Sequence, residues 1–211
     1  MINTYNYLTI DTNTNDQFEK LILNNVYLNW KAFWSNVLQR LNCELKCNEF
    51  RRAKYLGVVL QNERIVSFHL SSVHDFKLSP HVDHDYISQN FTPHFLHEVN
   101  NRNLTRGLSV EYLSVMKDFQ QSMRLPFAKI TLGLAFEFLK TVNDVEFTFG
   151  ITRDSKKVNQ MVTDYGVEII QSGIIKNNEP SSLVLGEKSK LTPSRDPAVA
   201  QAVDYLWQKR N

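Results

Sequence analysis

The stretch from Gly107 to Ile170 decides the fold. It reads GLSVEYLSV (107–115), MKDFQQSMRL (116–125), PFAKITLGLAFEFLKTV (126–142), VEFTFGIT (145–152), SKKVNQMVTDYG (155–166) and VEII (167–170). Apolar alternation and helical spacing predict the order strand, loop, long buried helix, strand, short helix, strand. A strand that leads through a loop into a helix N-terminus makes a place for phosphate groups. A parallel strand after that helix builds a cleft beside it.

The residues on either side of this stretch complete one α/β pattern. Upstream, the spacing predicts a strand at 5–10, helices at 18–26 and 27–41, and a hairpin with strands at 54–61 and 64–73. Downstream, it predicts strands at 167–175 and 182–185 and an extra C-terminal helix at about 196–210. The whole chain, 1–211, is therefore predicted to be a single α/β domain with a mixed, mostly antiparallel sheet flanked by helices.

Two tryptophans and a tyrosine share one helical stripe near the N-terminus. Tyr27, Trp30 and Trp34 follow each other in steps of three and four residues. One interpretation is that this stripe packs on the sheet as core, and the other is that it walls a substrate pocket. We favour core packing, because an amphipathic helix usually buries its apolar face.

The composition is typical of a globular protein and argues against a nucleic-acid-binding, secreted or membrane-spanning one. The 211 residues are 42% hydrophobic and include 13 Phe, 8 Tyr and 3 Trp, enough to fill a core. The net charge is +2 and the basic residues are spread out, so nucleic acid is not expected as a partner. No signal peptide and no run of about 18 apolar residues is present, which predicts a cytoplasmic protein without a membrane span. Cys43 and Cys47 do not suggest a disulfide framework or a zinc site.

All six histidines fall between His69 and His97, interleaved with aspartates in PHVDHDY (80–86). A metal site is one explanation, since imidazole and carboxylate groups bind zinc or iron. A substrate-binding loop with one functional histidine is a second, and ordinary loop composition is a third, which we favour. We expect no metal.

The order of elements resembles that of the GNAT superfamily of N-acyltransferases over almost the whole chain. In that family the fourth strand ends in a short pattern of apolar residues followed by an acidic and an aromatic residue. Here Leu113 and Val115 hold the apolar positions. Asp118, Phe119 and Gln120 follow at the acidic, aromatic and Gln/Arg positions.

Four positions depart from the GNAT pattern. Met123 and Leu125 stand where the family usually has small residues that let the backbone approach a pyrophosphate. Val162 stands where the family often has a tyrosine that protonates the leaving thiolate, and Tyr165 lies roughly 300° further round the helix. Ser155 stands in the place of the family's asparagine.

A branch of this superfamily, the autoinducer synthases and long-chain N-acyl amino acid synthases, offers a closer resemblance. The layout of VSFHLSSV (66–73), DYISQNF (85–91) and SVEYLSV (109–115) is similar to theirs. Their fourth-strand Glu and Arg would fall on Ser109 and Tyr112. That branch often takes acyl groups from acyl carrier protein.

The resemblance implies an N-acyltransferase that moves an acyl group from acyl-CoA or acyl carrier protein to the amine of a small molecule. The expected partners are that amine and, for the second donor, the carrier protein, and a homodimer is compatible with the chain. The resemblance places the donor against Leu113, Val115, Phe119, Gln120, Gln121, Arg124, Phe127 and Ser155.

Acyl transfer to an amine needs a polarised thioester carbonyl, commonly bound by a strand N–H, and a base that takes the amine proton. Glu111 is our candidate base, and strand alternation places it on one face with Ser109 and Leu113. His69 on the third strand is the candidate that assists it.

Two other functions remain open. The departures at Met123, Leu125 and Val162 favour a non-enzymatic binding or interaction protein of GNAT shape that has lost donor binding. The histidine-rich segment supports a third interpretation, an enzyme that uses a bound metal.

Overall fold

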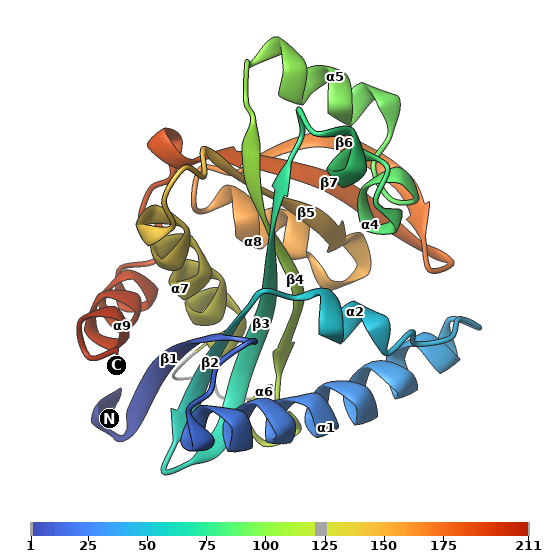
Figure 1. Ribbon diagram of the computed structural model, residues 1–211. Coiled ribbons are helices and arrows are strands. Elements are labelled where there is room, and N and C mark those ends of the chain that lie inside the picture. The colour runs from blue at the N-terminus through green and yellow to red at the C-terminus, as the bar shows by residue number, and fades with distance from the viewer. Residues whose placement is uncertain (1, 121–125, 211) are drawn as a thin grey trace. The chain divides into compact units, whose positions relative to one another are not determined.

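A computed structural model describes residues 2–120 and 126–210 of the chain (Figure 1). Its seven strands form one sheet in the order β1-β2-β3-β4-β5-β7-β6. Registers are antiparallel for β1–β2, β2–β3, β5–β7 and β6–β7, and parallel for β4–β5. The predicted fold class, a mostly antiparallel sheet flanked by helices, is confirmed.

The strands are β1 (Tyr5–Asp11), β2 (Tyr55–Gln61), β3 (Arg64–Asp75), β4 (Arg106–Val115), β5 (Phe147–Arg153), β6 (Glu168–Lys176) and β7 (Glu179–Glu187). The α-helices are α1 (Gln17–Arg40), α2 (Asn48–Arg52), α3 (Ser79–Val82), α4 (Asp85–Ser88), α5 (Pro93–Asn101), α6 (Lys117–Gln120), α7 (Phe127–Thr141), α8 (Val158–Thr163) and α9 (Pro197–Gln208). Short 3-10 turns at Ile2–Thr4, Asp154–Lys156 and Lys188–Lys190 complete the described chain.

The order of elements agrees with the sequence prediction, with two differences near the N-terminus and in the histidine-rich segment. The stretches predicted as two helices at 18–26 and 27–41 form the single helix α1, while the second helix is the short α2. Asp16 caps α1 by accepting a hydrogen bond from the Glu19 N–H at 2.9 Å. Two one-turn helices, α3 and α4, occupy part of 74–106, because helices of four residues leave no periodic apolar signal.

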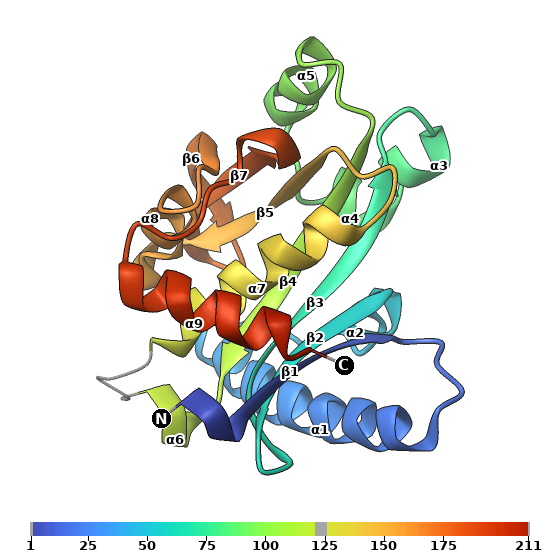
Figure 2. The ribbon, with the colours of Figure 1, turned by 90° about the vertical axis from the view of Figure 1, so that its left-hand side faces the viewer.

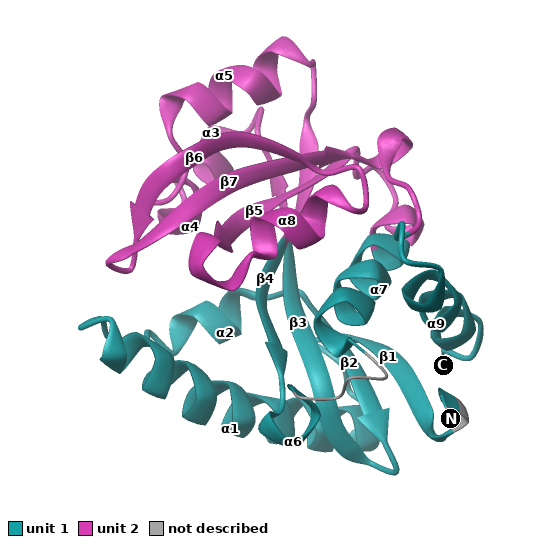
Figure 3. Ribbon diagram, turned by 180° about the vertical axis from the view of Figure 1, so that it is seen from behind, with its two compact units in different colours: residues 1–72, 110–138, 194–211 teal, residues 73–109, 139–193 magenta. Residues whose placement is uncertain are grey.

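The chain divides into two compact units, and each is made of separate stretches of sequence (Figure 3). Unit 1 comprises 1–72, 110–138 and 194–211, and unit 2 comprises 73–109 and 139–193. The predicted extra C-terminal helix is α9, in unit 1.

Helix α1 lies along one face of the unit 1 strands (Figure 2) and buries its apolar stripe there. Ile22, Val26 and Trp30 recur at helical spacing and form one core cluster with Phe68 and Leu70 of β3. Although α1 has 24 residues, no helix in the described chain is long and apolar enough to span a bilayer.

Helices α7 and α9 lie over the opposite face of the unit 1 strands (Figure 2), and a row of buried polar side chains lies on that face. Ser67, His69 and Ser71 alternate along β3 and are fully buried. The His69 ring lies 3.1 Å from the Tyr7 hydroxyl at Nε2 and 3.1 Å from the Ser71 hydroxyl at Nδ1. Burial lowers the pKa of His69 to about 4, so the ring is neutral near pH 7.

Unit 2 has a separate core rich in phenylalanine. Phe147 and Phe149 of β5 pack with Phe91 and with Phe95 of α5, and the Phe91 and Phe95 ring centroids are 4.8 Å apart. Thr92 caps α5 and Pro93 takes its first turn, where a missing N–H costs no intrahelical bond.

Replacing Gly57 of β2 by alanine is expected to destabilise the protein by about 2 kcal/mol, the cost of overfilling a core. A Cβ at this position would lie 2.1 Å from His69 Nε2 and 2.5 Å from the Tyr7 hydroxyl. Urea denaturation measures the effect. In a background that carries His69→Ala the same change should cost less than half as much, and an equal cost in both backgrounds would contradict the steric explanation.

The burial of His69 also predicts a pH dependence of stability. Because its pKa is about 4 in the folded state and about 6.5 in an unfolded chain, the unfolded state binds the extra proton between these values. The stabilisation, about 3 kcal/mol at most, is complete above pH 6.5 and is lost as the pH falls towards 4.

Urea denaturation of the wild type and of His69→Gln at pH 7.5 and 4.5 tests this prediction. The free energy of unfolding should fall less in His69→Gln than in the wild type. The matched control is His97→Gln, at an exposed histidine of α5, which should keep the wild-type pH dependence. Identical pH dependence in all three proteins would disprove the account.

Candidate functional site

Strand β4 leaves the extended conformation at Tyr112, whose φ is 51°. A bulky residue rarely adopts this left-handed geometry, and holding it costs on the order of 1–3 kcal/mol. Backbone of this kind is typical of a β-bulge, where one residue falls outside the regular ladder and its side chain is re-aimed. Strained backbone gathers at functional sites, so Tyr112 marks where a site in unit 1 should be sought.

The kink changes which side chains of β4 share a face. Glu111 and Tyr112 are consecutive, yet Glu111 contacts Arg52 and Tyr112 contacts Glu49, and both partners lie on α2. In a regular strand they would point to opposite faces. Ser114 also lies on this side, because its hydroxyl accepts a hydrogen bond from Trp34 Nε1 at 2.9 Å.

The sequence prediction that Glu111 and Leu113 share a face rests on strict alternation, which does not hold through Tyr112. The face on which Leu113 lies stays a prediction. Simple alternation failed here because the left-handed residue shifts the period by one.

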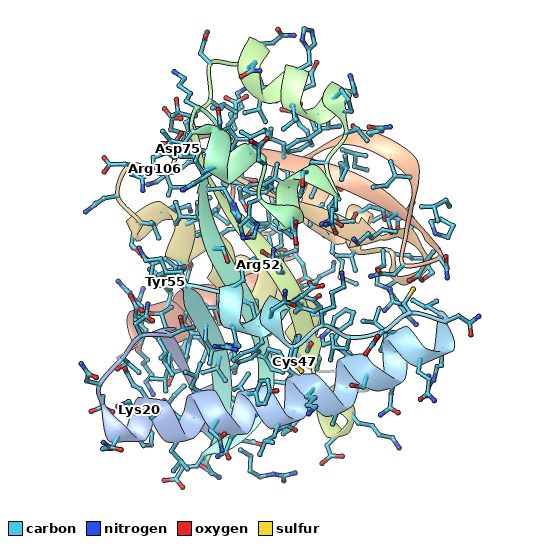
Figure 4. All side chains as sticks on the ribbon, turned by 45° about the vertical axis from the view of Figure 1, so that its right-hand side comes forward. Lys20, Cys47, Arg52, Tyr55, Asp75 and Arg106 are labelled. Atoms are coloured by element: carbon cyan, nitrogen blue, oxygen red, sulfur yellow. The ribbon has the colours of Figure 1, made fainter. Side chains whose placement is uncertain are left out.

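We call Glu49, Arg52, Glu111 and Tyr112 the α2 network (Figure 4 labels Arg52). Arg52 Nη2 bonds to Glu111 Oε2 and lies 3.6 Å from Glu49 Oε2, which accepts the Tyr112 hydroxyl hydrogen bond. The side chains of Arg52 and Glu111 are 13% and 7% exposed, so this ion pair is largely withdrawn from water. Burying an ion is costly, and a pair in contact offsets much of that cost.

Aromatic rings surround Tyr112. The Trp34 and Trp30 rings meet it edge-on at centroid distances of 5.0 and 5.5 Å, and Phe50 of α2 lies 5.2 Å from Trp30. Burial first, and then the nearby Glu49 carboxylate, raise the pKa of Tyr112 above its usual range, so its hydroxyl keeps its proton. Trp30 belongs to the buried core, which supports core packing as the role of this part of the stripe.

The structure does not bring the two predicted catalytic residues together. Glu111 faces α2, whereas His69 lies in the polar row on the face that carries α7 and α9. A catalytic role for His69 stays a prediction.

The predicted donor residues of unit 1 lie around the end of β4 and the start of α7. Gln120 Nε2 donates to the Val115 carbonyl at 2.8 Å, and the Phe119 ring lies 6.0 Å from that of Phe127. Phe127 is 2% exposed and packs on Tyr5. Their roles stay predictions, as does that of Leu113. Gln121, Met123, Arg124 and Leu125 lie outside the described residues.

In unit 2 the predicted donor residue Ser155 donates its hydroxyl hydrogen bond to Glu179, which also receives Arg153 Nε. Burial raises the pKa of Glu179, but these bonds outweigh burial and hold the pKa below its usual value. Val162 and Tyr165 are both buried, so the chain offers no exposed tyrosine at the family's general-acid position.

Strands β4 and β5 pair in parallel over a short register. The paired residues run from Gly107 with Phe147 to Ser109 with Phe149, all in unit 2. From Gly150 to Arg153, β5 continues along β7. The ladder between β4 and β5 thus covers the first part of β4, and the kink at Tyr112 comes three residues after it ends.

The histidine-rich segment of unit 2 gathers three imidazoles, His74, His81 and His84. The His81 and His84 centroids lie 6.5 and 6.0 Å from that of His74. His81 Nδ1 accepts the Asp75 N–H at 2.8 Å, and His84 Nδ1 accepts the Tyr86 N–H at 3.2 Å. These two rings act as acceptors for turns of the chain, and no group in 2–120 and 126–210 is arranged to hold a metal ion.

The sequence analysis missed Glu49 and Arg52. They lie three residues apart in NEFRR (48–52), a spacing that places both on one face of a helical turn. The segment is too short for a periodic signal, and nothing local indicated that Glu111 would be its partner.

Comparison with known proteins identifies the fold. The sequence matches no protein-family profile, and no curated protein is significantly similar to it. Solved structures do resemble it. The acyl-homoserine lactone synthase BjaI, a CoA-dependent enzyme solved with SAM and isopentyl-CoA, has a TM-score of 0.58 at 11% identity, over 96% of this chain and 89% of that one.

Two further structures cover nearly the same span. NAA60 of Arabidopsis thaliana, bound to a bisubstrate analogue, has a TM-score of 0.56 at 8% identity, over 87% of this chain and 98% of that one. FeeM, an N-acyl amino acid synthase from uncultured soil microbes, has a TM-score of 0.52 at 7% identity, over 89% and 93%. The protein therefore has the GNAT fold, with neighbours among the acyl-homoserine lactone synthases and the N-acyl amino acid synthases.

Proposed function

We propose that the protein is an N-acyltransferase that moves an acyl group from an acyl thioester to the amine of a small molecule. The observation that carries this proposal is the left-handed Tyr112 within β4, next to the buried Glu111. It supplies a backbone that leaves the extended conformation and a carboxylate beside it, on a fold whose solved neighbours include acyltransferases.

The reaction needs one new bond and one broken bond. The amine nitrogen attacks the thioester carbonyl carbon, a C–N bond forms, and the C–S bond breaks. We assign Glu111 as the base that takes the amine proton, and a backbone N–H of β4 near Tyr112 as the donor to the carbonyl oxygen. The thiolate leaves and takes up a proton from solvent, and Glu111 afterwards releases the amine proton to solvent, which balances the step.

We propose acyl-CoA as the donor, because NAA60 and BjaI have been solved with acetyl-CoA and isopentyl-CoA. In unit 1 the proposed donor contacts are Leu113, Val115, Phe119, Gln120 and Phe127, with Gln121 and Arg124 proposed from the sequence alone. The proposed role of Ser155, in unit 2, is a separate prediction. Acyl carrier protein remains the alternative donor, and an amino acid amine is one form of the acceptor, by analogy with FeeM.

A second candidate function is a non-enzymatic binding or interaction protein of GNAT shape that has lost donor binding. The buried Val162 favours it, since this position carries no group that could protonate a leaving thiolate.

Donor binding gives the first test. Acetyl-CoA or a longer acyl-CoA at about 100 times its Kd should raise the melting temperature by about 5 °C. The rise should shrink in Phe119→Ala and persist in the matched variant Phe18→Ala, which alters an exposed ring of α1. No rise with acetyl-CoA, longer acyl-CoAs or free CoA would argue against a CoA donor.

The base assignment gives the second test. Glu111→Gln should lower kcat by about 100-fold or more while the donor Kd changes less than about twofold, because an amide cannot accept the amine proton. Steady-state kinetics and donor titration measure the two quantities. Glu44→Gln, at an exposed carboxylate, is the control and should match the wild type. Equal losses of kcat and donor affinity would count against a base role for Glu111.

A further inference from the structure

Two residues of one helical turn form hydrogen bonds to two consecutive residues of β4. Arg52 of α2 bonds to Glu111, and Glu49, three residues earlier, accepts the Tyr112 hydroxyl. We propose that Arg52 is a positioning residue for acyl transfer, which holds the Glu111 carboxylate in place and in its ionised form. This inference rests on the proposed function, in which Glu111 is the base.

The helix that carries Arg52, α2, is anchored in the core of unit 1. Its neighbour Phe50 is 7% exposed and belongs to the core of unit 1, and Ala53, which ends the helix, is 4% exposed. The Ser72 hydroxyl donates to the Arg52 carbonyl at 3.3 Å, which ties the end of α2 to β3. A group can orient a reacting side chain only when its own position is fixed, and α2 meets that condition.

The charges around Glu111 decide whether it can act as a base. Among the described residues, the titratable groups of the network that face it are Arg52 and Glu49 of α2 and its neighbour Tyr112, which stays neutral. The guanidinium favours the carboxylate form, and the second carboxylate opposes it. Arg52 therefore forms ion pairs with two carboxylates, and without it Glu49 and Glu111 would repel each other.

This balance predicts shifts of opposite sign. Removal of the cation in Arg52→Gln favours protonated Glu111, so activity should be lost at a higher pH as the pH falls. Removal of the rival anion in Glu49→Gln favours the carboxylate, so activity should persist to a lower pH. The amide oxygen that Glu49→Gln introduces can still accept the Tyr112 hydroxyl hydrogen bond, which leaves the bulge supported.

The experiment measures kcat/KM from pH 4 to 9 for the full-length wild type, Arg52→Gln, Arg52→Lys and Glu49→Gln, with acetyl-CoA or the best acyl-CoA donor. We expect Arg52→Gln to lower kcat/KM at pH 7 by about tenfold and to move the acid limb up by about one pH unit. Arg52→Lys keeps a cation and should leave the limb near its wild-type position. Glu49→Gln should move it down.

A misfolded variant loses activity at every pH, so the opposite shifts separate positioning from a structural role. If Arg52→Gln does not fold, the downward shift in Glu49→Gln and the unchanged limb of Arg52→Lys carry the test. Wild-type acid limbs in both Glu49→Gln and a folded Arg52→Gln would overturn the inference.

Glu111→Gln separates this failure from failure of the proposed function. If Glu111→Gln abolishes the acid limb while the Arg52 and Glu49 variants leave it in place, only the role of Arg52 is wrong. If Glu111→Gln keeps the wild-type rate and limb, the base assignment fails, and the inference about Arg52 falls with it.

Discussion

A tyrosine held in a left-handed conformation inside a strand is unfavourable, and unit 1 is arranged to stabilise it. Tyr112 gains a hydrogen bond to Glu49 and edge-on contacts with Trp30 and Trp34. Each contact is worth roughly 1 kcal/mol, and together they offset a backbone cost of the same order. The kink in β4 therefore depends on α1 and α2, although neither helix is near it in sequence.

The kink has two consequences for chemistry. It lets a carboxylate and a phenol from neighbouring residues reach the same short helix, and it takes backbone out of the regular ladder soon after the pairing of β4 with β5 ends. A buried carboxylate needs a partner, and Arg52 supplies one at the cost of facing a second acid. Arg52 can therefore keep the Glu111 carboxylate ionised, although its single positive charge does not balance both acids of the α2 network.

The fold followed from the sequence because its elements are long and periodic. The alternation of β2 and β3, the apolar helix α7 and the cap at Asp196 each carry a local signal, and the order of elements identified the GNAT resemblance. The site did not follow in the same way. Strand alternation assumes extended backbone, so it could not anticipate the left-handed conformation of Tyr112. The Arg52–Glu111 pair joins residues 59 positions apart, which no local pattern can foretell.

The most direct measurement of the central claim is a crystal structure with a bound acyl-CoA. The account predicts that Tyr112 keeps its positive φ and that the thioester oxygen lies about 3 Å from a backbone N–H of β4 next to Tyr112. It also predicts that the Glu111 carboxylate stays on Arg52, on the side from which the amine arrives. A regular, extended β4, or a thioester bound away from this strand, would contradict it.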